Sequence, residues 1–466
     1  MNRFPPKPAT PDNWHKITHT TTQQNSIGEE IQKAPAKSTI ILPPGDYYEN
    51  LEIKKDIHLV GEGSTIINAL PSGDPITIDG ANVFLEHLTI QTGNSQCASP
   101  INLIGGTIIV EKCNIISSFM PAITIHKEGR LYFNECTITS NMMPIIYTNN
   151  SIKIEFQKCT ISAPKSIGIV ATNFSQVRFV ESKITGCGDS GIVVMNSASL
   201  SVDKSVIENN AGDAIELNTD SLSNTILNTT ITNHESGSAI NCSGKGRLRI
   251  EKCKISKCVS GFFGSNEFNI NSTQCEILDM ISSALIYAIK KSVINLNGDI
   301  LSGKCLSGII SDHQSSVKCE QVTLSDIETT GAFVSGNSLL KMNKCKVENI
   351  GQIAIESTEA STIEITDTDI EKVGKIGKYE LYQGIASIVC NILFWMYNFS
   401  HQRRVSFMQN LGDLILFVFL PSVFVLVCLS RQSALLDITE GSSIPLDRWI
   451  SKLGNFIKTV TAPKYN

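Results

Sequence analysis

The sequence is poor in charged residues and in aromatic residues. Charged residues make up 18% of its 466 positions, aromatic residues make up 6%, and the formal net charge is only −5. Neither a basic stretch nor an acidic stretch stands out, whereas surfaces that bind nucleic acids depend on clustered lysine and arginine. We therefore expect no nucleic-acid partner.

Motifs that would hold a metal ion or close a disulfide are also missing, although the chain has 14 cysteines. There is no CxxC pair and no Cys/His cluster at ligand spacing. The histidines outside the termini are scattered along the chain, at positions His58, His87, His126, His234 and His313. Residues 1–26 are polar and show no signal-peptide pattern. We therefore interpret the cysteines as small core residues of a protein in a reducing compartment, and we predict neither a metal nor a cofactor.

A short phrase recurs about every 23 residues between positions 86 and 370. It reads Glu-Lys-Cys-Asn-Ile at 111–115, Asn-Glu-Cys-Thr-Ile at 134–138 and Gln-Lys-Cys-Thr-Ile at 157–161. The last apolar residues of successive copies lie 22 to 25 positions apart, at Ile90, Ile115, Ile138, Ile161, Ile184, Ile207, Ile231, Ile255, Ile277, Ile300, Leu324, Val347 and Ile370. So regular a period predicts a solenoid, in which each repeat buries its apolar face against its neighbours.

Each repeat contains three short runs in which apolar and polar residues alternate. Around Cys159, for example, these runs are 152–156, 159–161 and 167–169, with Asn, Ser, Gly or Lys at the breaks. Such runs are typical of strands, and three strands per coil predict a right-handed parallel β-helix of about 13–15 coils. The phrase then places one column of small residues at a tight interior corner: Cys113, Cys136, Cys159, Ser182, Ser205, Thr229, Cys253, Cys275, Cys345 and Thr368.

The β-helix is expected to span residues 27–372, behind a disordered arm at 1–26. Residues 27–34 place Ile27, Ile31 and Ala34 at helical spacing, which predicts a short helix that caps the first coil. Pro43-Pro44-Gly45 then forms the first corner of the solenoid.

The stretch from Ile27 to Gly63 resembles the entry segment of the pectin-lyase-like superfamily, in the branch of parallel-β-helix-repeat proteins. The resemblance covers residues 27–372. Members of this branch include bacterial copper-site maturation proteins and eukaryotic F-box and Shc-binding proteins, in which the β-helix is an interaction module. The resemblance implies the fold more than any single function.

The composition changes after the last repeat. Residues 373–383 read as a polar linker, and residues 384–430 contain two apolar segments that predict one or two transmembrane helices. A re-entrant or interfacial segment is the alternative for the first of these two. In the polar tail, 431–466, an amphipathic pattern at 446–459 predicts a helix in the membrane interface or, alternatively, a helix packed on the last coil.

If both apolar segments cross a membrane, the flanking lysines favour a cytoplasmic position for the β-helix. The lipid bilayer is then one partner, bound through residues 384–430. Glycosylation sequons point to the opposite topology, although they are common by chance in corners rich in asparagine and serine; they lie at Asn149, Asn173, Asn228, Asn241 and Asn271.

Catalytic motifs of β-helix enzymes are largely missing from the sequence. Asn218-Thr219-Asp220 matches the first tripeptide of the polygalacturonase pattern, but the Asp-Asp, Gly-His-Gly and Arg-Ile-Lys that should follow are absent. Pectate-lyase and pectin-methylesterase signatures are absent too, and no tryptophan lies between residues 15 and 394 to form a sugar platform.

The best remaining candidates are three carboxylates on adjacent coils: Asp189, Asp213 and Glu216. They could shift each other's pKa or bind a cation. The simpler interpretation is that both aspartates sit in turns and accept hydrogen bonds from the backbone.

Three functions fit these patterns. The first is a membrane-anchored, non-catalytic scaffold for an unknown protein partner, which the even repeat spacing favours because no long loop is inserted to wall a catalytic groove. The second is a protein that binds or degrades a carbohydrate, with a glycan as its ligand. The third is a structural or adhesive surface protein.

Overall fold

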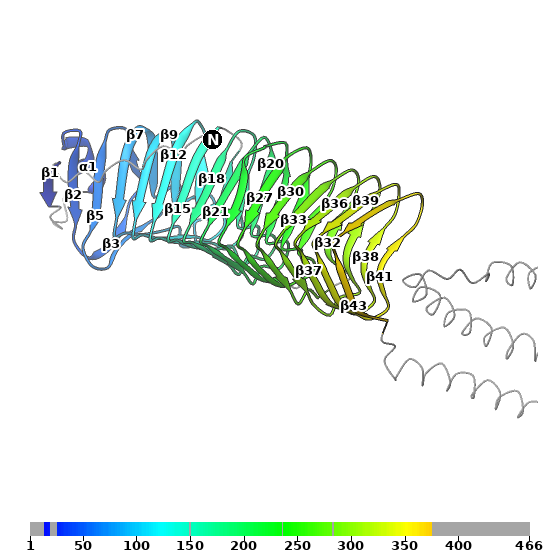
Figure 1. Ribbon diagram of the computed structural model, residues 1–466. Coiled ribbons are helices and arrows are strands. Elements are labelled where there is room, and N and C mark those ends of the chain that lie inside the picture. The colour runs from blue at the N-terminus through cyan, green and yellow to red at the C-terminus, as the bar shows by residue number, and fades with distance from the viewer. Residues whose placement is uncertain (1–13, 19–25, 149–150, 235, 282–283, 375–466) are drawn as a thin grey trace, which may run out of the picture. The chain divides into compact units, whose positions relative to one another are not determined.

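A computed structural model of the chain describes residues 14–18, 26–148, 151–234, 236–281 and 284–374 (Figure 1). Within these residues the chain forms one α-helix and 43 β-strands. Each strand pairs in parallel with the equivalent strand of the next coil, and 15 strands follow one another in the smaller of the two sheets. The predicted fold, a right-handed parallel β-solenoid of about 15 coils, is confirmed.

Each coil contributes strands to three columns, which we number in chain order. Column 1 contains β4 (Leu51–Ile53), β11 (Ile123–Ile125), β14 (Ile146–Thr148), β17 (Ile169–Ala171), β20 (Ile192–Asn196), β23 (Ile215–Thr219), β26 (Ile240–Ser243), β29 (Phe262–Gly264), β32 (Ala284–Ala288), β35 (Ser307–Ser311), β38 (Thr330–Val334) and β41 (Ile353–Ser357). Two longer strands run through columns 1 and 2 without a break: β7 (Ile76–Glu86) and β9 (Ile101–Glu111).

Columns 2 and 3 complete the coils. Column 2 contains β1 (His15–Thr18), β2 (Ser38–Leu42), β5 (Ile57–Gly61), β12 (Gly129–Asn134), β15 (Ile152–Gln157), β18 (Gln176–Val180), β21 (Ser199–Asp203), β24 (Asn224–Leu227), β27 (Arg247–Glu251), β30 (Asn269–Thr273), β33 (Val293–Asn297), β36 (Ser316–Glu320), β39 (Leu339–Asn343) and β42 (Thr362–Thr366). Column 3 contains β3 (Gly45–Tyr48), β6 (Thr65–Asn68), β8 (Thr89–Gln91), β10 (Asn114–Ser117), β13 (Thr137–Ser140), β16 (Thr160–Ser162), β19 (Lys183–Thr185), β22 (Val206–Glu208), β25 (Thr230–His234), β28 (Lys254–Cys258), β31 (Glu276–Leu278), β34 (Ile300–Ser302), β37 (Thr323–Ile327), β40 (Lys346–Ile350) and β43 (Asp369–Val373).

The corner between columns 2 and 3 explains the recurring phrase. One residue there adopts the left-handed conformation in each coil, as Lys112 does at φ 51° and Glu135 at φ 54°. Where the next residue is Cys, Ser or Thr, it points inward, and its Sγ or Oγ donates to the carbonyl oxygen two residues before it. In other coils this buried position is occupied by Leu88, Asp299 or Val322. The Cys136 Sγ lies 3.3 Å from the Asn134 oxygen, and the Ser182 Oγ lies 2.9 Å from the Val180 oxygen. The predicted column of small inward residues is therefore confirmed, and each member also satisfies a carbonyl that the turn leaves unpaired.

Aliphatic and aromatic side chains fill the interior of the coils. Phe133, Phe156 and Phe179 occupy the same register position in β12, β15 and β18 and are almost completely buried. Their rings are stacked, with centroids 5.1 and 5.0 Å apart. The alternation that predicts strands thus places one apolar column on the inside of every coil.

The predicted N-terminal helix is present as α1 (Ile27–Lys33). Ser26 caps it by accepting a hydrogen bond from the Glu29 amide, and Ile27 and Ile31 are buried, as their spacing predicts. The Glu49 carboxylate accepts hydrogen bonds from the first two helical amides, at 2.9 and 3.0 Å. These contacts fix the helix on the first coils, whereas its role as a cap stays a prediction.

The expectation of a disordered arm over residues 1–26 is wrong for four of them. His15–Thr18 form β1, which pairs in register with β2. Trp14 packs edge-on against Phe84, at 5.5 Å between ring centroids, and joins a cluster with Ile109 and Tyr132. A strand of four residues is too short to show a sequence pattern of its own. It forms by pairing with the free edge of β2, which the rest of the fold provides.

The segments predicted after the β-helix fall almost entirely outside the described residues. These are the rest of the linker at 373–383, the apolar region 384–430, the tail 431–466 and its helix 446–459. In the part of the chain that the structure describes, no helix is long and apolar enough to cross a membrane.

Candidate functional site

The outer face of column 1 carries one continuous row of side chains, because residues of a strand point alternately in and out. The strand register aligns one outward position through successive coils. We call this row the column-1 ladder; it consists of Tyr147, Val170, Val193, Glu216, Asn241, Phe263, Tyr287, Ile310 and Phe333. Its composition changes from apolar through acidic to aromatic along the solenoid.

The three carboxylates predicted from sequence lie together at the acidic part of the ladder. Burial raises the pKa of Glu216, and the negative charges of Asp213 and Asp189 raise it further. Asp213 uses both of its oxygens in the corner of its coil: one accepts from the Ser238 amide at 2.6 Å, the other from the Asn241 side chain at 2.8 Å. Asp189 accepts from the Ser190 amide at 2.8 Å. Both aspartates thus bond to the backbone.

An equivalent arrangement occurs much earlier in the chain. Asp74 accepts hydrogen bonds from the Ser99 amide and from the Asn102 side chain, each at 2.7 Å. The sequence separations of 25 and 28 residues are the same as those around Asp213. The same pair of contacts thus occurs at two distant places in the solenoid, and at each place it links one corner to the next coil. Asp213 is therefore accounted for structurally, and Glu216 is the carboxyl that faces outward from the ladder.

The aromatic part of the ladder was missed by the reasoning from sequence. Phe263, Tyr287 and Phe333 are half-buried on the outside of the strands, and the rings of Phe263 and Tyr287 are 5.8 Å apart. Tryptophan is not the only residue that can form a sugar platform, since phenylalanine and tyrosine also offer flat apolar rings. Aligning the outward positions of successive column-1 strands would have revealed these rings, because they recur at the repeat spacing.

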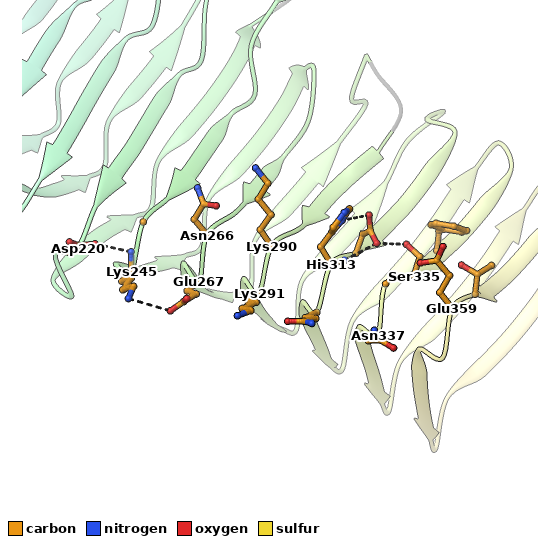
Figure 2. A pocket seen from close by; sticks show the side chains of 16 residues that line it. Asp220, Lys245, Asn266, Glu267, Lys290, Lys291, His313, Ser335, Asn337 and Glu359 are labelled. Carbon is orange, nitrogen blue, oxygen red and sulfur yellow. Dashed lines mark hydrogen bonds and ion pairs between the residues drawn. The ribbon is translucent and has the colours of Figure 1, made fainter.

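A groove of about 1140 Å³ continues from the aromatic end of the ladder (Figure 2). Phe333 belongs to both features. The turns between columns 1 and 2 form the rest of the groove, which is lined by Asp220, Gly244, Lys245, Asn266, Glu267, Lys290, Lys291, Asp312, His313, Gln314, Ser335, Gly336, Asn337, Thr358 and Glu359. This lining offers many hydrogen-bonding groups and spans several consecutive coils.

The turns of the groove have a repeated conformation that sets the direction of its side chains. Two consecutive residues adopt left-handed φ angles between 51° and 70° in each of five coils: Asn266 and Glu267, Lys290 and Lys291, His313 and Gln314, Gly336 and Asn337, and Glu359 and Ala360. In Figure 2, Asn266 and Lys290 point to one side of the row, whereas Glu267 and Lys291 point to the other. The groove is thus flanked on both sides by polar side chains.

Several charges in the groove are neutralised within it. Lys245 lies 3.8 Å from the Glu267 carboxylate, and its amide donates to Asp220 at 3.0 Å. Asp312 contacts the His313 Nδ1 at 2.5 Å and accepts from the Ser335 Oγ at 2.6 Å. Burial works to raise the pKa of Asp312, but the hydrogen bonds from Ser335 and His313 and the charge of His313 together hold it below its ordinary value.

No metal site is formed by the described residues, since no three His, Cys, Asp or Glu side chains among them are placed to hold an ion. Of the scattered histidines, His313 lines the groove, whereas His234 is completely buried at the end of β25, close to Asp213. Burial lowers the pKa of His234. Asp220, from the polygalacturonase-like tripeptide, lines the groove and accepts a backbone hydrogen bond.

The comparison with known families gives a clear assignment. The model of the right-handed β-helix region matches residues 49–180 and 167–319, which together are more than half of the chain. The chain belongs to the right-handed β-helix family. No curated protein matches it significantly.

Solved structures similar to this chain include three β-helix enzymes. Pectate lyase Pel9A is 11% identical, with 76% of this chain and 78% of that chain covered and a TM-score of 0.34. A thermostable α-1,3-glucanase from Streptomyces thermodiastaticus is 12% identical, with 79% and 70% covered and a TM-score of 0.45. The A-module of a mannuronan C-5 epimerase from Azotobacter vinelandii is 11% identical, with 74% and 93% covered and a TM-score of 0.36. Likeness at this level does not bear on the activity of this chain.

Proposed function

We propose that this protein binds an extended carbohydrate chain, which lies along the aromatic part of the column-1 ladder and enters the groove. The observation that carries the proposal is the row of Phe263, Tyr287 and Phe333 on the outside of adjacent or nearby coils, with Phe333 also lining the groove.

The dimensions of the ladder suit a linear polymer. Neighbouring strands are about 4.8 Å apart, which is close to the length of one pyranose residue. A sugar chain that runs along the solenoid axis can therefore present successive rings to successive coils. Aromatic rings supply large apolar contact area, and a few well-placed polar groups add orientation.

The groove supplies polar groups suited to sugar hydroxyls. Asn266, Gln314, Asn337 and Ser335 offer amide and hydroxyl groups from consecutive coils. Amide side chains both donate and accept, which matches the hydroxyl groups of a carbohydrate.

The proposal is one of binding rather than of cleavage. Hydrolysis of a glycosidic bond usually needs two carboxyl groups on either side of the scissile bond. Glu216 has the raised pKa that suits an acid. Its neighbour Asp213, however, is occupied by Ser238 and Asn241, in the same way as Asp74 is by its own partners.

A protein partner is a second candidate, and one observation favours it. Phe119, Met142, Met143 and Tyr147 are exposed by 39% to 51% on neighbouring coils at the other end of the ladder. Large apolar side chains that gather on the surface are a feature of protein-interaction sites. This patch supports the scaffold function that the sequence predicts. Membrane anchoring, which concerns residues that the structure does not describe, and a cytoplasmic location of the β-helix stay predictions.

Equilibrium binding of the full chain to a panel of soluble linear glucans, xylans and galactans tests the proposal. A Phe263→Ala/Tyr287→Ala double variant should lose roughly tenfold or more in affinity for the polysaccharide that binds the wild type, since buried aromatic contacts dominate such sites. Tyr48→Ala is the matched control, because this ring is 63% exposed and lies in β3, in column 3 rather than column 1. Equal binding by wild type and double variant would refute the proposed site.

A further inference from the structure

We infer that two copies of this chain associate side by side through an uncharged, partly apolar face near the N-terminal end of the solenoid. This contact is separate from the proposed carbohydrate site, and a second copy is the protein partner that the second candidate function leaves open. We call the surface the self-association face. It lies on the five consecutive coils whose column-3 strands are β6, β8, β10, β13 and β16.

A ridge of large apolar side chains runs along this face, in and next to the turns that lead from column 3 to column 1. Their exposed fractions lie between 37% and 51%, although apolar side chains gain free energy by leaving water. Three coil spacings separate the first member from the last, which makes the ridge roughly 14 Å long. Its members are Leu70, Phe119, Met142, Met143 and Tyr147.

The turn that carries Phe119 is held in place before any partner binds. The hydroxyl groups of Ser117 and Ser140, on neighbouring coils, both donate to the carbonyl oxygen of Met120, the second at 3.2 Å. The Asn141 amide donates to the Ser117 carbonyl oxygen at 2.9 Å. Since the turn is already ordered, a contact through Phe119 costs little conformational entropy of the backbone.

Charged side chains are missing from this face. Among the described residues of these coils, the turns at 92–100, 118–122 and 141–145 contain none, and neither do the outward positions of the strands beside them. Charges return at the two edges, with Lys165 and with Asp74, which is hydrogen-bonded to Ser99 and Asn102. The outward residues beside the ridge are Thr89, Gln91, Asn114, Ile116, Thr137, Thr139, Thr160 and Ser162 in column 3, and Asn102, Thr124 and Tyr147 in column 1.

An uncharged face suits contact with a second copy of the same chain. In a two-fold symmetric contact the same residues occur on both sides, so a charge close to the axis would face a like charge. Like charges that meet in an interface cost free energy, and this face avoids them. A different protein is commonly recognised through charges of opposite sign, for which this face offers no counterpart.

The composition beside the ridge also favours a protein surface over a lipid bilayer. The threonine and asparagine side chains of column 3 can form hydrogen bonds across a protein interface, as polar groups usually do there. In hydrocarbon the same groups would lose water without a replacement. Methionine side chains adapt to an uneven surface, which helps Met142 and Met143 to pack against a second copy of the ridge.

Cys97 gives this face a chemical probe of its own. It is the one exposed cysteine among the described residues, and its turn lies between the turns of Leu70 and Phe119. If the two-fold axis passes near Phe119, the two Cys97 residues are separated by two coil spacings, or about 10 Å. A short bismaleimide reagent spans such a distance and joins the two chains covalently.

The test uses the full chain with Cys390→Ser and Cys428→Ser, so that thiols beyond the described residues do not react. We expect a crosslinked dimer on a denaturing gel, with a yield that rises with protein concentration, and the mass of a dimer in sedimentation equilibrium. Adding Cys97→Ser should abolish the crosslink but keep the dimer. Adding Phe119→Asp/Met142→Asp should weaken dimerisation at least about tenfold, because the new charges face like charges across the axis.

Leu222→Asp/Leu306→Asp is the matched control, because it adds the same charges at apolar residues that are 66% and 52% exposed in turns outside the face. This control should dimerise as the parent chain does. All variants should keep the circular dichroism and the melting temperature of the parent monomer at low concentration.

The inference is overturned if the parent chain is a monomer, or if the Phe119→Asp/Met142→Asp variant dimerises as strongly as the parent. A monomeric parent that binds phosphatidylcholine vesicles, with binding lost in that variant, would assign the face to a bilayer instead. Binding to the neutral polysaccharide panel should be the same in parent and variant. Failure of self-association is therefore distinguishable from failure of the proposed carbohydrate site.

Discussion

The role of Asp213 can be decided by comparing it with Asp74. Each carboxylate accepts one backbone amide and one asparagine side chain from the next coil, at 2.6 to 2.8 Å. Hydrogen bonds to charged groups contribute about 1.5–3 kcal/mol each, and removing the acceptor leaves two donors unpaired. Since both sites are only partly buried, water recovers part of this loss. We expect Asp213→Ala and Asp74→Ala each to cost roughly 2–4 kcal/mol.

An asparagine variant adds a graded step. In Asp213→Asn the side-chain oxygen can still accept from the Ser238 amide, but the new NH₂ group then faces the NH₂ group of Asn241. One hydrogen bond is kept and one is lost, so the cost should be about half of that for alanine, or roughly 1–2 kcal/mol. Loss of the charge also removes one cause of the raised pKa of Glu216, which should fall toward its ordinary value.

Amide hydrogen exchange is the suitable assay, because a solenoid can open locally without unfolding as a whole. The Ser238 amide should lose protection in the Asp213 variants, and the Ser99 amide should lose a similar amount in Asp74→Ala. Carbohydrate binding should persist in both. A structural role of Asp213 would be contradicted if Asp213→Ala left the protection of the Ser238 amide unchanged, or if it abolished carbohydrate binding while stability stayed at the wild-type level.

Three further predictions concern the scaffold. Burial raises the pKa of Asp299, so the protonated carboxyl stabilises the fold; this stability is present below the unfolded-state pKa of about 3.9 and is lost as pH rises through the folded-state pKa. Asp299→Thr supplies the hydroxyl that other coils have at this corner. In urea titrations at several pH values, this variant should no longer show the dependence of unfolding free energy on pH that Asp299 causes. Phe156→Ala should lower the free energy of unfolding, measured with urea, by about 3–5 kcal/mol. This is roughly 0.5–1.5 kcal/mol more than for Phe179→Ala, because the Phe156 ring has an aromatic neighbour on both sides. Equal losses in the two variants would contradict a contribution from ring stacking. Glu49→Gln should weaken the anchoring of α1 by about 1 kcal/mol, seen as faster exchange of the Ile27 and Gly28 amides, whereas unchanged exchange would rule out this anchor.

The regular features of the fold could be predicted because the sequence pattern of each one lies within a single repeat. Cys136 and its equivalents mark the corner after the left-handed residue, and the alternation around them shows which side chains face inward. Ile27 and Ile31 predict α1 by their spacing alone. Such patterns are local, and the solenoid only repeats them.

Features that depend on contact between coils were harder to predict. The bond from Asn241 to Asp213 joins residues 28 positions apart, and β1 exists because β2 offers an unpaired edge. Phe263 and Tyr287 become a surface only when the register sets them side by side. The groove likewise arises from turns whose side-chain directions depend on backbone conformation rather than on composition.

The most direct test of the proposed carbohydrate site is hydrogen–deuterium exchange of the full chain with and without a saturating polysaccharide from the neutral panel. A polysaccharide bound at this site should add protection in β29, β32, β35 and β38 and in the turns that line the groove, with no change in β12 or β15. Protection confined to the exposed patch around Met142 and Tyr147, or to no part of column 1, would contradict the proposed site.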